Sequence, residues 1–248
     1  RHAKAVSRRQ NGMNVYGIMY PFAWYFHILQ MKSRNNRFYG GSQERYLQYM
    51  KNSERYCGCS RSPRNEEYKE YNEEYRRILD EMIRKMTGAQ LTGSVSLNFI
   101  RQMIPHHRAA VQMSENLLKY RGSGPLAKIA ENIITEQTKG ISELEKAERK
   151  CRNSVSSDCV LYRYGKENDI ILCDMFSDMT DAVSDGNIEC DFIREMVPHH
   201  LGAVRMSENA LKSGVCRELV PILTSIIRTQ KRGIMQMRRL SRRLGCRT

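Results

Sequence analysis

The chain has 248 residues, of which 40% are hydrophobic and 27% charged, and it contains no run of 18 or more apolar residues. This composition predicts a folded protein without a transmembrane helix, large enough for one two-repeat unit. The net charge of +14 is concentrated at the ends: residues 1–65 carry +10, residues 231–248 carry +7, and the interval between them carries −3. Basic tails attract anionic partners weakly, but no aromatic-interleaved motif indicates specific nucleic-acid binding.

Residues 1–65 form a basic lead rich in Asn, Arg, Ser and Tyr, which we expect to be partly disordered. No charged segment followed by an apolar stretch and a cleavage site opens the chain, so we expect a cytoplasmic protein. The same reasoning favours free thiols over disulfides for the eight cysteines. Cys57 and Cys59 are close in sequence, but one short pair is more typical of a surface loop than of a metal site.

Helical periodicity begins near Asn65, a suitable helix cap. It predicts a first repeat over residues 66–150, a polar linker over 151–166 and a second repeat over 167–244. In each repeat the first helix has apolar residues at three- and four-residue spacing. The matching positions lie 93 residues apart: Ile78, Leu79, Met82, Ile83 and Met86 correspond to Ile171, Leu172, Met175, Phe176 and Met179.

The second helix of each repeat is predicted at about 97–120 and 190–213, and the third at about 125–149 and 217–243. Residues 99–118 and 192–211 are identical at 14 of 20 positions, which indicates an internal duplication. No strand-like alternation occurs in this part of the chain. We therefore predict an all-α, ferritin-like helical bundle of two tandem three-helix repeats with pseudo-twofold symmetry, in which the second and third helices form the core.

Each second helix carries an adjacent histidine pair, and the two pairs account for four of the six histidines. On a helical projection, His106 and His107 both border the apolar stripe that contains Met103. Pro105 and Pro198 precede the pairs, so the histidines are expected either at a helix N-terminus or beside a kink. Both placements bring imidazoles close to an apolar core, where the neutral form is favoured.

Neutral imidazole and thioether sulfur together favour copper, Cu(I) in particular, although other transition metals share these ligands. We therefore expect binding or buffering of a soft metal without catalysis. One alternative is a structural or interaction module in which Gln137 and Gln230 hydrogen-bond the histidines and the basic tails contact an acidic partner. A second alternative, a di-metal redox enzyme, requires clustered carboxylates and a Glu-x-x-His pattern that the sequence lacks.

The two motifs, Met-Ile-Pro-His-His and Met-Val-Pro-His-His, resemble a bacterial family called domain of unknown function 305. The resemblance covers roughly residues 75–150 and 168–243 and implies a ferritin-like bundle. Some members of that family are linked to copper binding, often outside the cytoplasm, which implies a metal-binding role here. The positions implied as ligands are Met103, His106, His107, Met113, Met196, His199, His200 and Met206.

The two copies depart differently from the family pattern. The family has an aspartate three residues before the motif phenylalanine, where this chain has Ser96 and Glu189. The small residue after the histidines is Gly202 in the second copy and Ala109 in the first. The resemblance therefore implies that only the second site keeps a carboxylate ligand, Glu189, and we expect the second site to be the better one.

Overall fold

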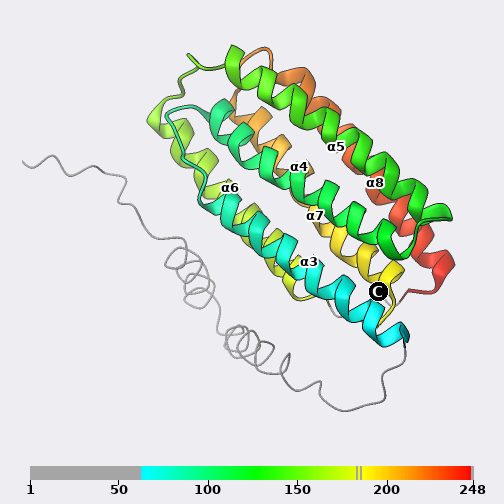
Figure 1. The fold of residues 1–248 in the computed structure, drawn as a ribbon. Helices are drawn as coiled ribbons and strands as arrows, with labels where there is room; N and C mark the ends of the chain where they lie inside the picture. The colour runs from blue at the N-terminus through cyan, green and yellow to red at the C-terminus, as the bar shows by residue number, and fades with distance from the viewer. Residues whose placement is uncertain (1–62, 183, 185, 247–248) are drawn as a thin grey trace, which may run out of the picture. The chain divides into compact units, whose positions relative to one another are not determined.

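A computed structural model describes residues 63–182, 184 and 186–246, so the predicted N-terminal lead and its cysteine pair lie outside the described residues. The described chain contains six helices and no strand (Figure 1). Their bounds are α3 Pro63–Thr87, α4 Val95–Tyr120, α5 Pro125–Lys150, α6 Asp158–Thr180, α7 Ile188–Ser213 and α8 Val220–Leu244.

Local signals in the sequence explain where several helices begin and end. Ser94 caps α4 by accepting a hydrogen bond from the Leu97 amide, and Asn187 caps α7 by accepting bonds from the amides of Glu189 and Cys190. Pro125 opens α5, where its missing N–H has no cost. Gly245 ends α8 in the left-handed conformation, with φ of 69°, which a side chain would disfavour.

The six helices form three layers of two: α3 with α6, α4 with α7, and α5 with α8 (Figure 1). The α4 and α7 helices, which carry the histidines, form the central layer and are covered on both sides. One tertiary hydrogen bond recurs in both repeats: Asn116 Nδ2 donates to the carbonyl of Tyr71, and Asn209 Nδ2 donates to that of Tyr164. The predicted bundle of two three-helix repeats is confirmed, and pairing α4 and α7 places the two motifs face to face.

The segment between the repeats is shorter than predicted. Helix α6 begins at Asp158, so residues 158–166 are helical rather than part of a linker. Asp158 places an acidic side chain in the first turn, where it complements the helix dipole. Tyr164, in the second turn, is 3% exposed and anchors this end of α6 in the core. The remaining connection contacts α4, since Ser154 and Ser94 share a hydroxyl hydrogen bond of 2.6 Å.

Two disulfides contradict the expectation of free thiols. Cys151 at the end of α5 is joined to Cys216 in the α7–α8 connection, with Cα atoms 5.9 Å apart. Cys190 in the first turn of α7 is joined to Cys246 beyond α8, with Cα atoms 5.4 Å apart. Because the two cysteines of each pair lie 65 and 56 residues apart in sequence, only the folded chain brings them together. Among the other described cysteines, Cys159 is exposed and outside both disulfides.

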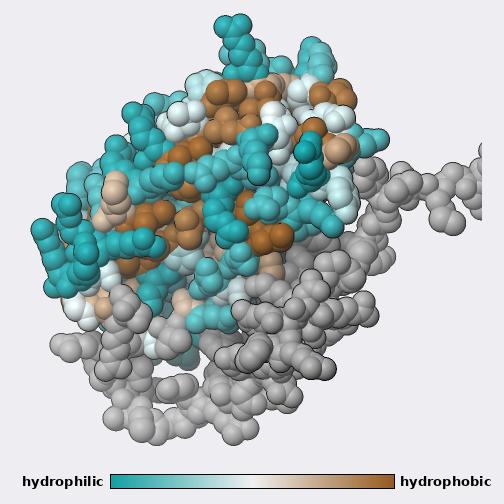
Figure 2. Space-filling model, turned by 180° about the vertical axis from the view of Figure 1, so that it is seen from behind, coloured by the Kyte–Doolittle hydropathy of each residue, from teal (hydrophilic) through white to brown (hydrophobic). Residues whose placement is uncertain are grey.

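The surface alternates apolar and charged groups. On the face seen in Figure 2, hydrophilic side chains separate the patches of hydrophobic ones. None of the helices within the described residues combines the length and the apolar character needed to cross a membrane. Part of the basic C-terminal stretch is the exposed side of α8, where Lys231 pairs with Glu208.

Candidate metal centre

The histidine pairs lie in the middle of long helices. Pro105 is preceded by ten residues of α4, and Pro198 by ten residues of α7, so of the two expected placements the one at a helix N-terminus is excluded. The helix dipole therefore has little influence on the imidazoles, because its effect is confined to the end turns. Their state depends instead on burial: His106, His107, His199 and His200 are each exposed by 2% or less.

His106 and His199 meet at the centre of the molecule. Their rings stack with centroids 3.6 Å apart and planes inclined by 29°. Nε2 of His106 lies 3.1 Å from the carbonyl oxygen of His199, and Nε2 of His199 lies 3.1 Å from the carbonyl oxygen of His106. This reciprocal pair, which we call the inner histidine pair, joins α4 to α7 across the pseudo-twofold relation.

These two hydrogen bonds assign the tautomer of the inner histidine pair. A carbonyl oxygen can only accept, so each Nε2 must carry the proton and donate it. Nδ1 of each neutral ring then holds an unshared electron pair, and neither Nδ1 has a hydrogen-bond partner within the described residues. A backbone carbonyl that holds one ring nitrogen while leaving the other free is the usual support of a metal-ligating histidine.

His107 and His200, the outer histidine pair, extend toward the α5–α8 layer. Each packs against a glycine there: a Cβ built at Gly140 would lie 2.8 Å from His107 Cδ2, and one at Gly233 would lie 2.9 Å from His200 Cδ2. The two glycines are 93 residues apart and so belong to the duplicated design. Glycine at these positions allows the imidazoles to lie directly on the backbones of α5 and α8.

The predicted hydrogen bonds from Gln137 and Gln230 to the histidines are not formed. Both amides are buried, but Oε1 of each lacks a partner, as does Nδ1 of all four histidines. Each unpartnered buried polar atom costs roughly 1–3 kcal/mol. The centre therefore holds six of the buried polar atoms that lack a partner among the described residues.

Burial keeps the four imidazoles uncharged. It lowers the pKa of His106 to about 4, opposed by the backbone hydrogen bond at His199, and it lowers the pKa of His200 to about 3, with His106 adding to the effect. The pKa values of His107 and His199 also fall well below 6.5, first through burial and then through neighbouring histidines. At neutral pH all four rings are free to use a nitrogen lone pair.

The predicted sulfur ligands fall into two groups along the helices. Met103 and Met196 are fully buried and precede the histidines by three and four residues, one turn away on the same face. Met113 and Met206 are also buried but follow His106 and His199 by seven residues, about 10 Å along the helix axis. One metal ion cannot contact both groups, so only Met103 and Met196 lie at the level of the histidines.

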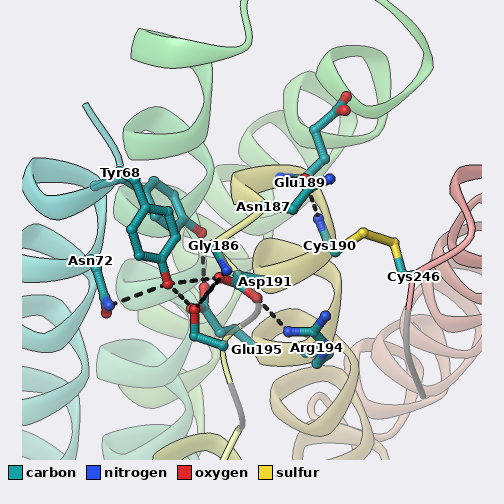
Figure 3. A network of polar contacts seen from close by, with 12 residues as sticks. Tyr68, Asn72, Gly186, Asn187, Glu189, Cys190, Asp191, Arg194, Glu195 and Cys246 are labelled. Atoms are coloured by element: carbon teal, nitrogen blue, oxygen red, sulfur yellow. Dashed lines mark hydrogen bonds and ion pairs between the residues drawn. A yellow bond between two sulfur atoms is a disulfide. The ribbon is translucent and has the colours of Figure 1, made fainter. Parts of the chain in front are cut away.

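Glu189 does not lie with the histidines. It occupies the first turn of α7, ten residues before His199, which corresponds to about 15 Å along the helix axis. Figure 3 shows its carboxylate pointing away from the polar network below it. Glu189, the carboxylate implied by the family resemblance, is therefore too far along α7 to share a site with the imidazoles of the same helix.

Sequence reasoning missed two buried carboxylates of α7, Asp191 and Glu195 (Figure 3). Tyr71 donates to Glu195 Oε2 at 2.8 Å, Tyr68 donates to Asp191 Oδ2 at 2.9 Å, and Arg194 pairs with Asp191. The tyrosines belong to α3 of the other repeat. The only signal in the sequence was the i, i+4 spacing from Asp191 through Glu195 to His199, which places all three on one side of α7.

The first repeat has amides in place of these carboxylates. Asn98 and Gln102 stand 93 residues before Asp191 and Glu195. Gln102 is satisfied by neutral partners, accepting a bond of 3.0 Å from Asn168 and donating to the Met86 carbonyl at 3.4 Å. The two halves of the centre therefore share their imidazoles and thioethers but differ in the ionisable groups one turn away.

A further thioether belongs to Met175, which the apolar spacing predicted only as a core residue. Met175 of α6 fills the space beside Gly202, where a Cβ would collide with its sulfur. Gly202 follows His199 by three residues, so this sulfur reaches α7 one turn beyond the histidine. The first repeat has Ala109 at the matching position, and this close approach therefore belongs to the second repeat.

Three-ligand chelation is not preformed at the histidines. Within residues 63–182, 184 and 186–246, Cys151, Cys216 and Glu218 are the one group of three His, Cys, Asp or Glu whose ligand atoms lie within 4.8 Å of one another, and its two cysteines form a disulfide. The arrangement therefore suits an ion that accepts one or two imidazoles with a thioether. It provides no histidine–carboxylate cluster for the di-metal alternative.

Comparison with known proteins gives a family and two similar structures. No curated protein matches the sequence. The structure named "CopM in the Ag-bound form (by soaking)" is 27% identical, with a TM-score of 0.46, and the match covers 61% of this chain and 98% of that one. "CopM in the apo form" is 28% identical, with a TM-score of 0.44, and the match covers 60% and 96%.

The sequence also matches the family described as "Domain of unknown function (DUF305)" over residues 40–148 and 172–241. The two segments together span more than half of the chain, and each contains one histidine motif with the helix that follows it. The chain therefore belongs to the DUF305 family, with the family's histidine helix present twice and the two copies packed against each other.

Proposed function

We propose that this protein binds a soft transition-metal ion, copper as Cu(I), at the four central histidines, and that it stores or buffers the ion without catalysing a reaction. The observation that carries the proposal is the inner histidine pair. Each ring donates Nε2–H to a backbone carbonyl and leaves a buried Nδ1 lone pair without a partner. Such lone pairs bind transition-metal ions strongly, because a neutral imidazole nitrogen is a good transition-metal ligand.

The donor set favours a soft and weakly charged ion. Neutral imidazoles and the thioethers of Met103 and Met196 offer no negative charge, whereas Ca²⁺ and Mg²⁺ require oxygen ligands, mostly carboxylates. Thioether sulfur favours Cu(I) over harder ions. Cu(I) also accepts two or three donors, so an imidazole and the methionine one turn before it suffice in each repeat.

Chelator competition with the metal-free protein tests the proposal. Wild-type protein is expected to take Cu(I) from a chromophoric chelator, and a variant with all four motif histidines changed to alanine is not. Because four truncations in the core can unfold the chain, Met103→Leu with Met196→Leu provides a second test that conserves volume. This variant is expected to stay folded and to bind Cu(I) more weakly.

The matched control changes two other buried methionines, Met86→Leu with Met179→Leu, which lie in α3 and α6 and are exposed by 1% or less. It is expected to retain wild-type affinity. Equal affinity of all three folded proteins would remove the methionines from the site. Equal metal uptake by the four-histidine variant would refute the proposal as a whole.

A structural role for the inner histidine pair is the second candidate function. The stacked rings and reciprocal hydrogen bonds favour it, because they join the two repeats without any metal. This candidate predicts that His106→Gln and His199→Gln lower the free energy of unfolding of the metal-free protein. It also predicts that the protein as purified has the same metal content with and without these substitutions. The basic tails would then contact an acidic partner in a salt-dependent way.

The disulfides support a location outside the reducing cytoplasm. Disulfides persist in oxidising compartments and are rare in cytosolic proteins. We therefore place the protein in an oxidising compartment rather than in the cytoplasm. Mass spectrometry of thiol-alkylated protein taken from its native compartment would test this, because cytoplasmic protein is expected to carry four additional alkylated cysteines.

A further inference from the structure

A pocket of about 220 Å³ between α5 and α8 leads from the surface to His107, one of the four motif histidines. His107 lines it from the α4 side, and Gln137 and Gln230 line it from the two flanking helices. Figure 1 shows α5 and α8 side by side on one face of the bundle, so the pocket opens between these two helices. The second pocket described, between α3 and α4, is lined by Pro105 but by none of the four histidines.

Gln137 and Gln230 place two buried amides in the wall of this pocket. Their exposures are 2% and 4%, yet Oε1 of each has no hydrogen-bond partner. They lie 93 residues apart, so each repeat supplies one amide oxygen. Together with the His107 ring they give the pocket three neutral donor groups, each with one atom that lacks a partner among the described residues.

The rim of the pocket is joined by one ion pair between the helices. Arg232 of α8 pairs with Glu136 of α5, and both residues line the pocket. A second rim pair, Lys139 with Glu143, lies within α5 and joins nothing across the opening. Only the first pair therefore has to separate when α5 and α8 move apart.

We infer that the pocket between α5 and α8 is the route by which the metal ion reaches the histidines, with Gln137, Gln230 and His107 forming an outer binding site. This inference rests on the proposed function. A monovalent soft ion passes from water to the two amide oxygens, then to the outer imidazole, and finally to the inner histidine pair. The Glu136–Arg232 pair holds the two helices together and limits the rate of passage in both directions.

The outer site suits a monovalent ion for an electrostatic reason. Removing an ion from water is costly, and the cost rises steeply with its charge. A neutral imidazole recovers more of this cost for a singly charged ion than for a doubly charged one, and the two amides add uncharged polar groups beside it. The acidic rim residues Glu136 and Glu143 each pair with a basic neighbour, so both carboxylates already have a cationic partner.

The test measures Cu(I) transfer by the full-length protein to and from a chromophoric chelator in a rapid-mixing instrument. Glu136→Gln and Arg232→Gln are expected to raise the association and dissociation rates together by about two- to fivefold, the range of an exposed ion pair, with unchanged equilibrium affinity. Glu143→Gln is the matched control, because it removes a rim carboxylate without separating the helices. It is expected to leave both rates unchanged.

The amides are tested by Gln137→Leu with Gln230→Leu, compared with Gln236→Leu on the exposed side of α8. The pocket variant is expected to bind Cu(I) about three- to tenfold more slowly, the range for one lost polar contact, and the control at the wild-type rate. Equal rates in all variants while wild-type protein binds Cu(I) would overturn the route and leave the proposed function standing. A similar rise for Glu136→Gln and Glu143→Gln would overturn the gate, because Glu143 joins nothing across the opening, and no uptake by wild-type protein would overturn both proposals.

Discussion

Replacing Glu195 by glutamine probes the ionisable group that distinguishes the two halves of the centre. Glu195 is 6% exposed and accepts a hydrogen bond of 2.8 Å from Tyr71. Burial raises its pKa from 4.5 to about 8, the hydrogen bond from Tyr71 opposes the shift, and the charge of Asp191 adds to it. The first repeat already places Gln102 at the matching position, so the substitution copies an arrangement that this fold accommodates.

The magnitude follows from the linkage between protonation and folding. The pKa is higher in the folded state, so the stabilisation is complete below about pH 4.5 and is lost as the pH rises toward 8. The full loss is about 5 kcal/mol, of which about 2 kcal/mol falls between pH 6 and pH 8. Glutamine carries no charge at any of these values. The stability advantage of Glu195→Gln over wild type should therefore grow by about 2 kcal/mol over that interval.

Urea unfolding of the metal-free proteins, followed by far-ultraviolet circular dichroism in the presence of a chelator, measures this difference. The histidines also titrate in the unfolded chain, but they are the same in both proteins and cancel. Glu189→Gln is the control for removing a carboxylate from the same helix, since Glu189 lies outside the buried network. A constant difference between Glu195→Gln and wild type would refute the buried, protonated carboxyl group.

Three further changes have defined outcomes. Gly140→Ala should lower the free energy of unfolding by about 1–3 kcal/mol, because its Cβ would meet the His107 ring at 2.8 Å, whereas Gly165→Ala in α6, with nothing within 4 Å, should gain up to about 1 kcal/mol in the same urea titration. Equal effects would show that His107 does not pack on α5. Cys190→Ser with Cys246→Ser should lose about 4 kcal/mol, because the bond closes a loop of 56 residues, and an unchanged urea midpoint would contradict this. The metal-free protein should lose stability as the pH falls from 6.5 toward 4, by about 3 kcal/mol from His106 alone, because its pKa is about 4 in the folded chain and 6.5 in the unfolded one. Because Glu195 gains stability as the pH falls over the same interval, the titration is made with Glu195→Gln, and a pH-independent stability of that variant would mean that water reaches the ring.

The local spacing of apolar residues was sufficient to predict the helices and the faces that they bury. The three- and four-residue spacing of apolar residues determines which side of each helix faces the core, and that spacing predicted the three helices of both repeats. It also placed the histidines on the buried side of α4 and α7. It was least informative at the start of α6, where few apolar residues precede Tyr164 and the helix is stabilised by burial of that side chain.

Partners across the repeats could not be predicted in this way. The sequence places Glu195 on the same side of α7 as His199, but only packing decides that α3 of the other repeat covers it with Tyr71. The cysteines were misjudged for the same reason, since each disulfide joins residues more than 50 positions apart. Glu189 lies near the motif in sequence, yet the rise of the helix carries it away from the histidines.

The sequence by itself determined the duplication, the all-α class and four imidazoles on apolar helical faces, because these depend on residue order and on the period of the α-helix. The tertiary structure alone decided that the two motifs face each other and that the inner histidine pair donates Nε2–H to opposing carbonyls. It also decided that six polar atoms of the histidine centre have no partner among the described residues. Hydrogen bonding and desolvation depend on what packs against a side chain, and here the packing residues come from the other repeat or from the next helix layer.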